Sequence, residues 1–291
     1  MGWLNDRLRA LRGLPLQDGQ SEAGEPQDPA TGDAASAKLP GTEELPLLSN
    51  RFPSEMVGDT RRAVHNCPLL TNHKRPRELR LHMEHPDKAS QAWQALLRLI
   101  EEAVQDGREE FAPGREMDGA LWHQITVLPP EIGALTKVRR LLLYGSSLLR
   151  IPPEIGQMQS LEVFEPYTSY GLHWFPYEIT LCRHLRESTV STRALYGNYK
   201  YRPSFPRLNR ADDIAALAPT HCSVCGASLT PATVKQVWIS LRVATDVLPL
   251  LVNACSQACI DSLPPGHENY IRTPHTGGLE QQQPGHSPYH M

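Results

Sequence analysis

Apolar residues recur at helical spacing between residues 88 and 105. Most of them fall three or four positions apart, which places them on one face of a helix: Ala89, Trp93, Leu96, Leu97, Ile100 and Val104. Asp87 follows a proline and is a candidate N-cap, while Gly107 is a candidate C-terminal cap. The pattern predicts an amphipathic helix that packs through this face.

A second pattern repeats along the chain with a longer period. The phrase Leu-Pro-Pro-Glu-Ile-Gly at 128–133 returns as Ile-Pro-Pro-Glu-Ile-Gly at 151–156 and, degraded, as Phe-Pro-Tyr-Glu-Ile at 175–179. The period is therefore 23 and then 24 residues. Apolar residues follow the phrases in a constant order: Val138, Leu141, Leu143 and Leu148, then Leu161, Phe164 and Leu172, then Leu185, Val190 and Leu195. A single unit of this size cannot bury its apolar side alone, so we expect neighbouring units to stack.

This period and phrase resemble the short class of leucine-rich repeat found in bacterial and plant intracellular proteins, over roughly residues 125–195. The resemblance implies a short solenoid with one strand in each unit and a concave face beside the buried leucines. At the buried asparagine position of that family the chain has Ser146, Ser169 and Arg193. We therefore do not expect the usual ladder of amide hydrogen bonds.

The predicted concave face carries aromatic side chains. Aligning the units places Arg140, Leu142 and Tyr144 beside Val163, Glu165 and Tyr167, and then beside Glu187, Thr189 and Ser191. Aromatic residues concentrate at binding hot spots, so this face is a candidate surface for a protein partner. The candidate partner-binding residues are Arg140, Leu142, Tyr144, Val163, Glu165, Tyr167, Tyr170 and Trp174. The alternative is that a terminal cap packs against the same side chains and hides them.

Four of the cysteines form two close pairs. Cys222 and Cys225 flank two residues and precede Gly226, which allows the tight turn of a metal-binding knuckle. Cys255 and Cys259 lie four positions apart at the start of a predicted helix, so their side chains point to the same side. Four thiolates leave no open position on zinc, and such a site holds the fold without doing chemistry. Redox-active thiols are the competing interpretation.

Between the two pairs, apolar β-prone runs at 234–243 and 247–253 predict a hairpin. A knuckle, a hairpin and a helix that carries the second pair resemble a treble-clef zinc finger. The resemblance implies one structural zinc ion held by all four cysteines.

The expected fold class is α/β: a short leucine-rich-repeat solenoid with an N-terminal helical cap and a C-terminal treble-clef-like zinc module. Expected boundaries are a disordered segment at 1–51, the cap region at 52–120, the repeats at 121–212, the zinc module at 213–264 and a disordered tail at 265–291. The arrangement from Arg61 to Gly278 is similar to a family of bacterial leucine-rich-repeat proteins with a C-terminal cysteine cluster. That family has no established activity, so the resemblance implies architecture only.

Composition narrows the class of function. A formal net charge of −3 gives no general attraction to nucleic acid or to an anionic membrane. No stretch approaches the ~20 apolar residues of a membrane span, and charged residues occupy the place of a secretory signal's apolar core. Since paired cysteines in a non-secreted chain favour metal over disulfides, we expect a cytoplasmic protein.

No motif for nucleophilic, phosphoryl-transfer or paired-carboxylate chemistry stands out, so we expect a non-catalytic scaffold that binds a protein. Two alternatives stay open. One is a thiol-dependent enzyme, redox or transfer, that uses the paired cysteines. The other is single-stranded nucleic-acid binding by residues 196–202, where aromatic and basic side chains alternate.

Overall fold

The computed structural model describes residues 81, 85–208 and 219–285 of the chain. The chain divides after Glu55 into two compact parts, and every described residue belongs to the second part. The expected disordered segment at 1–51 therefore lies outside the described residues, as do most positions before residue 85 of the expected cap region. The described residues form a mixed α/β fold with few helices, one parallel sheet and one mixed sheet.

Helix α3 (Gln91–Asp106) confirms the predicted amphipathic helix, although it begins later than the sequence suggested. The N-cap is Ser90, whose hydroxyl accepts the Trp93 N–H at 3.2 Å. Asp87 instead accepts the Ala89 N–H at 2.9 Å in the turn before the helix, so the predicted N-cap was wrong. Gly107 closes the helix in the left-handed region at φ 66°, as predicted. The face that packs inward consists of Ala92, Trp93, Leu96, Leu99, Ile100 and Ala103.

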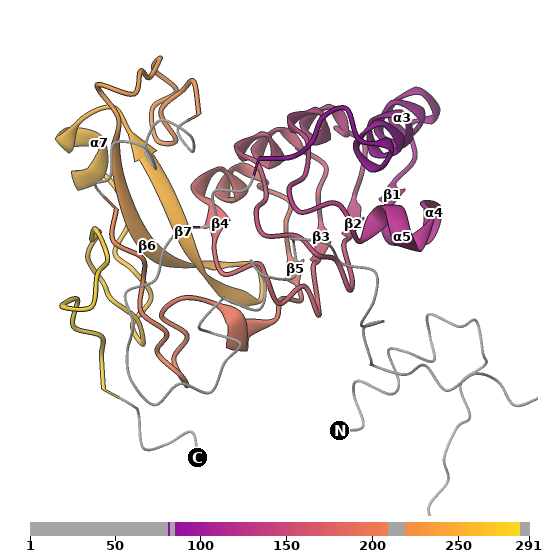
Figure 1. The fold of residues 1–291 in the computed structure, drawn as a ribbon. Helices are drawn as coiled ribbons and strands as arrows, with labels where there is room; N and C mark the ends of the chain where they lie inside the picture. The colour runs from indigo at the N-terminus through magenta and orange to yellow at the C-terminus, as the bar shows by residue number, and fades with distance from the viewer. Residues whose placement is uncertain (1–80, 82–84, 209–218, 286–291) are drawn as a thin grey trace, which may run out of the picture. The chain divides into compact units, whose positions relative to one another are not determined.

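A parallel sheet follows α3. Its order is β1 (Glu110–Phe111), β2 (Arg140–Leu142), β3 (Val163–Glu165) and β5 (Glu187–Ser188). Strand β1 precedes the first repeated phrase, and one further strand of the sheet follows each phrase. Arg140 pairs with Val163, and Val163 pairs with Glu187, which is the register that the sequence alignment predicted. The short helices α4 (Pro113–Glu116) and α5 (Gly119–Trp122) lie beside β1, close to α3 (Figure 1).

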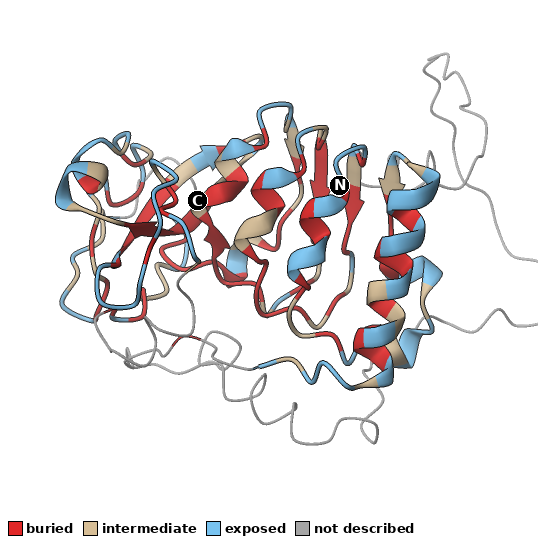
Figure 2. Ribbon diagram, turned by 90° about the horizontal axis from the view of Figure 1, so that it is seen from above, coloured by how far each residue is buried: buried red, intermediate tan, exposed pale blue. Residues whose placement is uncertain are grey.

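Each repeated phrase forms a short 3₁₀ helix on the side opposite the strands. These helices are η1 (Pro130–Ala134), η2 (Pro153–Gln157) and η3 (Tyr177–Leu181). Proline at the start fixes the first φ of η1 and η2, and no backbone N–H is lost because those first N–H groups have no helical partner. The three lie in a row, buried inward and mostly exposed outward (Figure 2). A fourth 3₁₀ helix, η4 (Thr192–Ala194), follows β5.

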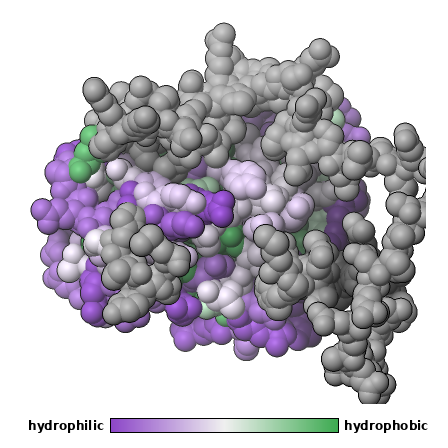
Figure 3. Space-filling model, turned by 90° about the horizontal axis from the view of Figure 1, so that it is seen from below, coloured by the Kyte–Doolittle hydropathy of each residue, from purple (hydrophilic) through white to green (hydrophobic). Residues whose placement is uncertain are grey.

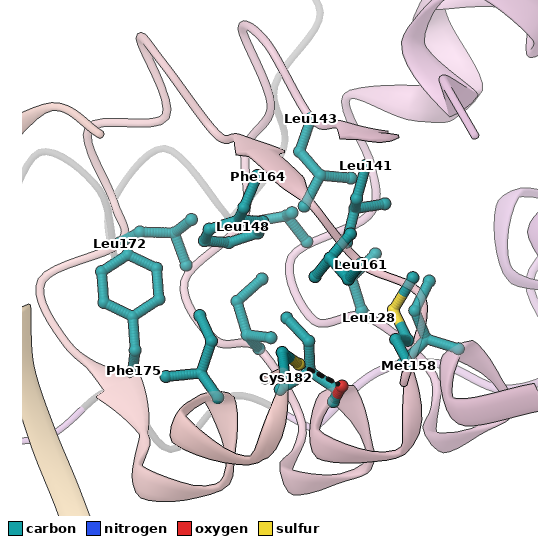
Figure 4. Packing of buried hydrophobic residues seen from close by; sticks show 14 of the residues in the cluster. Leu128, Leu141, Leu143, Leu148, Met158, Leu161, Phe164, Leu172, Phe175 and Cys182 are labelled. Atoms are coloured by element: carbon teal, nitrogen blue, oxygen red, sulfur yellow. Dashed lines mark hydrogen bonds between the residues drawn. The ribbon is translucent and has the colours of Figure 1, made fainter. Parts of the chain in front are cut away.

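The core fills the space between the strands and the 3₁₀ helices. Leu141, Leu143 and Phe164 point from the strand side towards η2 and η3, and each is 0% exposed (Figure 4). Phe164 meets Phe175 edge to face, with ring centroids 5.8 Å apart. Cys182 closes the opposite side, where its Sγ lies 3.2 Å from the Ile155 carbonyl oxygen. The apolar order read from the repeats is therefore the order of this core.

Gly156→Ala is expected to destabilise the stacked units. A Cβ at this position would lie 2.7 Å from the carbonyl oxygen of Glu178 in the next unit, a backbone atom that cannot rotate away. We expect the free energy of unfolding in denaturant to fall by about 1–3 kcal/mol. Gly119→Ala is the matched control, because nothing lies within 4 Å of its Cβ position. Equal stability of the two variants would contradict this account of the repeated glycine.

Buried serine hydroxyls link equivalent positions of consecutive repeated segments. The Oγ atoms of Ser146 and Ser169 lie 2.6 Å apart and are buried. The Thr168 N–H donates to Ser191 Oγ at 2.9 Å and continues these links into the third unit. When the repeated units were aligned with one another, Arg193 was assigned to the position of the third unit that Ser191 occupies in the structure. Arg193 is exposed. That assignment was wrong because the buried space accepts a small hydroxyl and not a guanidinium.

The mixed sheet has the order β4 (Phe175–Pro176), β7 (Asp246–Ala254) and β6 (Lys235–Val243). Strands β6 and β7 form the predicted hairpin, with nine paired positions and a turn that places Ala244 at φ 52°. Phe175 of β4 pairs in parallel with Leu250 of β7, so the hairpin is bonded directly to the third unit.

The two faces of the hairpin are buried in different cores. One face joins the core of the repeats through Val237, Ile239, Val243, Leu248, Leu250, Val252 and Ala254. The other joins an aromatic cluster, defined by Leu81, Trp174, Tyr196, Phe205, Leu208, Trp238, Leu251 and Ile271. Burial on both faces explains why the hairpin strands read as apolar runs without alternation.

The tip of the hairpin occupies the place that a further strand would take beside β5. The Ser188 N–H donates to Thr245 Oγ1 at 3.0 Å, and that hydroxyl donates to the Ser188 carbonyl oxygen at 2.6 Å. Ser188 Oγ lies 2.8 Å from Asp246 Oδ2 and is buried. These contacts satisfy polar groups at the edge of the parallel sheet, which would otherwise be open to pairing with another chain.

Residues 265–285 were expected to be disordered, but the structure describes them packed on the hairpin. The Trp238 N–H donates to the His275 carbonyl oxygen at 2.8 Å, and the His275 N–H donates back at 3.1 Å. Tyr270 and Ile271 are 8% and 9% exposed. The expectation rested on low hydrophobicity, whereas backbone pairing to β6 and these two apolar anchors order the segment.

Candidate metal centre

Cys222 and Cys225 lie in a tight turn that opens the C-terminal part of the chain. The Gly226 N–H donates to the Cys222 carbonyl oxygen at 3.0 Å, and the Cys222 N–H donates to the Ala227 carbonyl oxygen at 2.7 Å. Gly226 has φ 73°, in the left-handed region that favours glycine. The spacing predicted a tight turn at these residues, and the hydrogen bonds and Gly226 confirm that turn.

The second pair follows directly from β7. Cys255 comes one residue after the strand ends, and Cys259 lies in the short helix α7 (Gln257–Asp261). Ser256 caps this helix by accepting the Cys259 N–H at 3.3 Å. The end of the hairpin and the first turn of α7 therefore bring the second pair to the knuckle.

The four sulfur atoms converge on one point. All lie within 4.8 Å of one another, with Cys225 Sγ 3.5 Å and Cys259 Sγ 3.6 Å from Cys255 Sγ. A disulfide requires about 2.05 Å between sulfurs, so these are separate thiols. Tetrahedral coordination with metal–sulfur bonds of about 2.3 Å places ligand sulfurs about 3.8 Å apart. The separations therefore fit a four-coordinate metal ion, and no comparable group of ligands occurs elsewhere among the described residues.

The backbone around the knuckle favours a thiolate at Cys222. Burial acts to raise the pKa of this thiol, but N–H donors of Cys225, Val224 and Cys255 outweigh it and lower the pKa to about 7. Hydrogen bonds with the thiols of Cys225 and Cys259 raise the pKa of Cys255 to about 12. Several sulfurs this close can all be ionised only if a cation neutralises them, and that is the chemistry a metal ion supplies.

Polar residues that the sequence did not single out fix the knuckle against the fold. The Ser223 N–H donates to the Asn253 carbonyl oxygen at 2.8 Å, and Ser223 Oγ accepts the Asn253 N–H at 3.0 Å. Gln236 Nε2 donates to Asn253 Oδ1 at 2.7 Å. Glu178 of η3 is 8% exposed, and burial raises the pKa of its carboxyl group, which Ser223 acts to lower. A polar residue inside an apolar strand, as at Asn253, is the signal that could have indicated this network.

The structure separates the predicted partner-binding residues into exposed and buried groups. Tyr144, Tyr167 and Tyr170 are 64%, 37% and 48% exposed. Arg140 and Glu165 are half-buried, and Leu142 and Val163 are buried. Seen from below, the surface that grey atoms leave visible is hydrophilic at its rim and paler near its centre (Figure 3).

Trp174 lies in the aromatic cluster and not at the surface. It is 5% exposed, and its ring meets that of Trp238 edge to face, with centroids 5.8 Å apart. Its prediction as a partner-binding residue was therefore wrong in placing it on an accessible face. The hairpin covers it, and the pairing of β7 with β4 could not be read from the repeat period.

The aromatic and basic run at 196–202 divides in the same way. Tyr196 is 1% exposed in the aromatic cluster, while Tyr199 and Tyr201 are 43% and 52% exposed. Arg202 donates to the Asn269 carbonyl oxygen at 2.8 Å and stacks over Tyr270, so it holds the C-terminal segment. The run is therefore partly structural.

No family model matches the chain, and no match was found among curated proteins. Within the described part of the chain, no helix is long and apolar enough to cross a membrane. What the site does therefore has to be argued from its own residues.

Proposed function

We propose that the chain is a non-catalytic, cytoplasmic scaffold built on a short leucine-rich-repeat array, whose concave face binds a protein partner. The observation that carries this proposal is the pair of tyrosines that follow β2 and β3 at equivalent positions of consecutive units. Tyr144 and Tyr167 remain exposed, and their rings lie 6.0 Å apart. Tyrosine supplies a large contact area and loses little conformational freedom on binding, which is why it concentrates at hot spots.

The same proposal includes a structural zinc ion held by Cys222, Cys225, Cys255 and Cys259. Support comes from the chemistry of the ligands, since a compact set of four thiolates suits Zn²⁺ and leaves no position for a reacting water. Free cysteines persist in a reducing compartment, which is why we place the protein in the cytoplasm.

The double variant Tyr144→Ala/Tyr167→Ala tests the binding face. Both side chains are exposed, so we expect the thermal midpoint to stay near that of the wild type. In an affinity pull-down from lysate, we expect the partner captured by the wild type to be lost. Tyr201→Ala, at another exposed tyrosine, is the matched control and is expected to retain the partner. Unfolding of the double variant would show that the tyrosines are core residues, and no partner above background for the wild type would count against the scaffold.

A thiol-dependent enzyme is the second candidate. The observation in its favour is the lowered pKa of Cys222, about 7, next to the exposed Cys225. Elemental mass spectrometry with thiol counting separates the two candidates. About one zinc per chain with four unreactive thiols supports the scaffold. Four titratable thiols and no metal support the enzyme.

A further inference from the structure

The concave face of the parallel sheet is acidic in its second and third units. Arg140 forms an ion pair with Glu110 of the neighbouring strand, with 3.0 Å between Nη1 and Oε2. The face positions of the next two strands carry Glu165 and Glu187 and no lysine or arginine. Carboxylates beside tyrosine rings attract cationic groups, both by charge and by the negative face of the ring. The chemistry of the face therefore suits a basic peptide.

Two apolar positions of the same face are covered. Leu142 and Val163 alternate along their strands with the core residues Leu141 and Phe164, so their side chains point to the concave side. They are nevertheless 6% and 8% exposed, and neither belongs to the hydrophobic core of the repeats or to the aromatic cluster. An uncovered sheet face leaves such side chains in contact with water. A layer that is part of neither core therefore shields the middle of the face.

The chain itself supplies a basic segment. Residues 61–80 contain six lysine or arginine residues and one acidic residue, Glu78, which gives the segment a net charge of +5 in a chain whose total is −3. The basic residues are Arg61, Arg62, Lys74, Arg75, Arg77 and Arg80. The segment lies outside the described residues, but it falls within the compact part of the chain that begins at Met56 and includes the face. Opposite charges in one compact part favour contact between the two.

Leu81 fixes the end of this segment beside the acidic units. It is 6% exposed in the aromatic cluster, together with Trp174 and Tyr196. Trp174 directly precedes β4, which belongs to the third unit. The four strands of the parallel sheet lie side by side (Figure 1), and at about 4.8 Å between neighbours they span about 15 Å, which an extended chain covers in about five residues. A segment that begins at residue 61 and ends at Leu81 is therefore long enough to cross the whole face.

We propose that residues 61–80 bind the concave face of the same molecule and occupy it until a protein partner displaces them. Their basic side chains pair with Glu165 and Glu187, and the chain between them covers Leu142 and Val163. The inference rests on the proposed function of the face and adds its regulation, because the partner competes with an intramolecular ligand. The apparent affinity for the partner is then lowered by the fraction of time for which the face is free. The partner itself presents basic residues to the same carboxylates.

Zero-length crosslinking locates the segment in the full-length protein. A carbodiimide joins a lysine amine to a carboxylate in direct contact with it, and Lys74 is the only lysine of the segment. We expect mass spectrometry to find Lys74 joined to Glu165 or Glu187. Glu131 is the internal control, because it is exposed in η1, on the side opposite the strands, and is expected to form no such link. A link to Glu131 in equal yield, or no link from Lys74 to the face, would overturn the inference.

A second measurement asks whether the segment competes with an added ligand. The probe is a fluorescent peptide with the sequence of residues 61–80, titrated into full-length protein. Arg75→Glu/Arg77→Glu weakens the intramolecular contact, so we expect it to bind the peptide about 10-fold more tightly than the wild type, as for a face that is free about a tenth of the time in the wild type. Arg7→Glu/Arg9→Glu makes the same change of charge outside the segment and is expected to bind the peptide as the wild type does.

Reversal of the acidic side completes the test. Glu165→Lys/Glu187→Lys, added to the variant with the reversed arginines of the segment, is expected to remove the gained affinity. Equal peptide affinity of the two arginine variants would overturn the inference, as would a Lys74 link that forms only between an isotope-labelled and an unlabelled molecule, which would assign the face to a second copy. The proposed function is judged separately. If the double tyrosine variant still captures the partner, the binding face is overturned and its regulation with it, even where the link is found; if that variant loses the partner and the wild type forms no link, the inference alone is overturned.

Discussion

Replacing Cys222 by serine is expected to abolish metal binding and to unfold the C-terminal part of the fold. Cys222 is the buried member of the four, and three backbone N–H groups stabilise its thiolate. A serine hydroxyl keeps the shape but does not ionise at neutral pH, so the ion would lose one ligand of four. We expect the metal content to fall from about one per chain to background, and the free energy of unfolding to fall by more than about 4 kcal/mol.

The control for Cys222→Ser is Cys182→Ala, at a buried cysteine outside the four. This variant loses a packed sulfur and the contact to the Ile155 carbonyl oxygen, so some stability should be lost. Its metal content should nevertheless match the wild type. Elemental mass spectrometry and thermal unfolding separate the two effects, and unchanged metal content together with an unchanged midpoint in Cys222→Ser would contradict the assignment.

Trp238→Ala is expected to have an effect of similar size without touching the sulfur atoms. Trp238 is 0% exposed, packs edge to face on Trp174 and Tyr196, and donates its indole N–H to the Pro206 carbonyl oxygen at 2.9 Å. Truncation leaves a large cavity and an unpaired carbonyl group, so the free energy of unfolding should fall by about 3–5 kcal/mol.

Chemical denaturation checks this value, and Trp238→Phe is the graded control. Phenylalanine keeps most of the ring volume but lacks the N–H donor. We expect it to cost less than the alanine variant, about 1–2 kcal/mol. Equal losses in the two variants would contradict a cavity as the main cause. Metal content should stay at the wild-type level in both, because the indole faces the aromatic cluster and not the knuckle.

The elements that were predicted correctly are those marked by a regular spacing of residues in the sequence. The repeat spacing gave the parallel register of Arg140 with Val163, because equivalent positions of stacked units must pair. The two apolar runs gave the hairpin, and the Cys-x-x-Cys and Cys-x-x-x-Cys spacings gave the four residues whose sulfurs converge. In each case the signal was a spacing that could be read directly from the sequence, within one strand, within one cysteine pair or between consecutive repeated phrases.

The elements that were missed depend on contacts between distant segments. The pairing of Phe175 with Leu250 buries Trp174, and no local pattern links those positions. The C-terminal segment has few apolar residues, but the backbone bonds between Trp238 and His275 order it. Glu178 is buried in η3, which β7 contacts, whereas Glu154 in the equivalent sequence context is half-buried. Periodicity identifies units, and it does not identify what covers them.

The hydrogen bonds that join Ser188 of β5 to Thr245 and Asp246 at the hairpin tip have a consequence during synthesis of the chain. Ser188 and Asp246 are 58 residues apart, so the parallel sheet leaves the ribosome well before the residues that close its edge. At about 5–20 residues per second, that interval lasts about 3–12 seconds. Strand pairing within the sheet is complete in far less time, so the nascent chain carries an open sheet edge throughout it. The period of greatest exposure to misassembly therefore ends when translation passes β7.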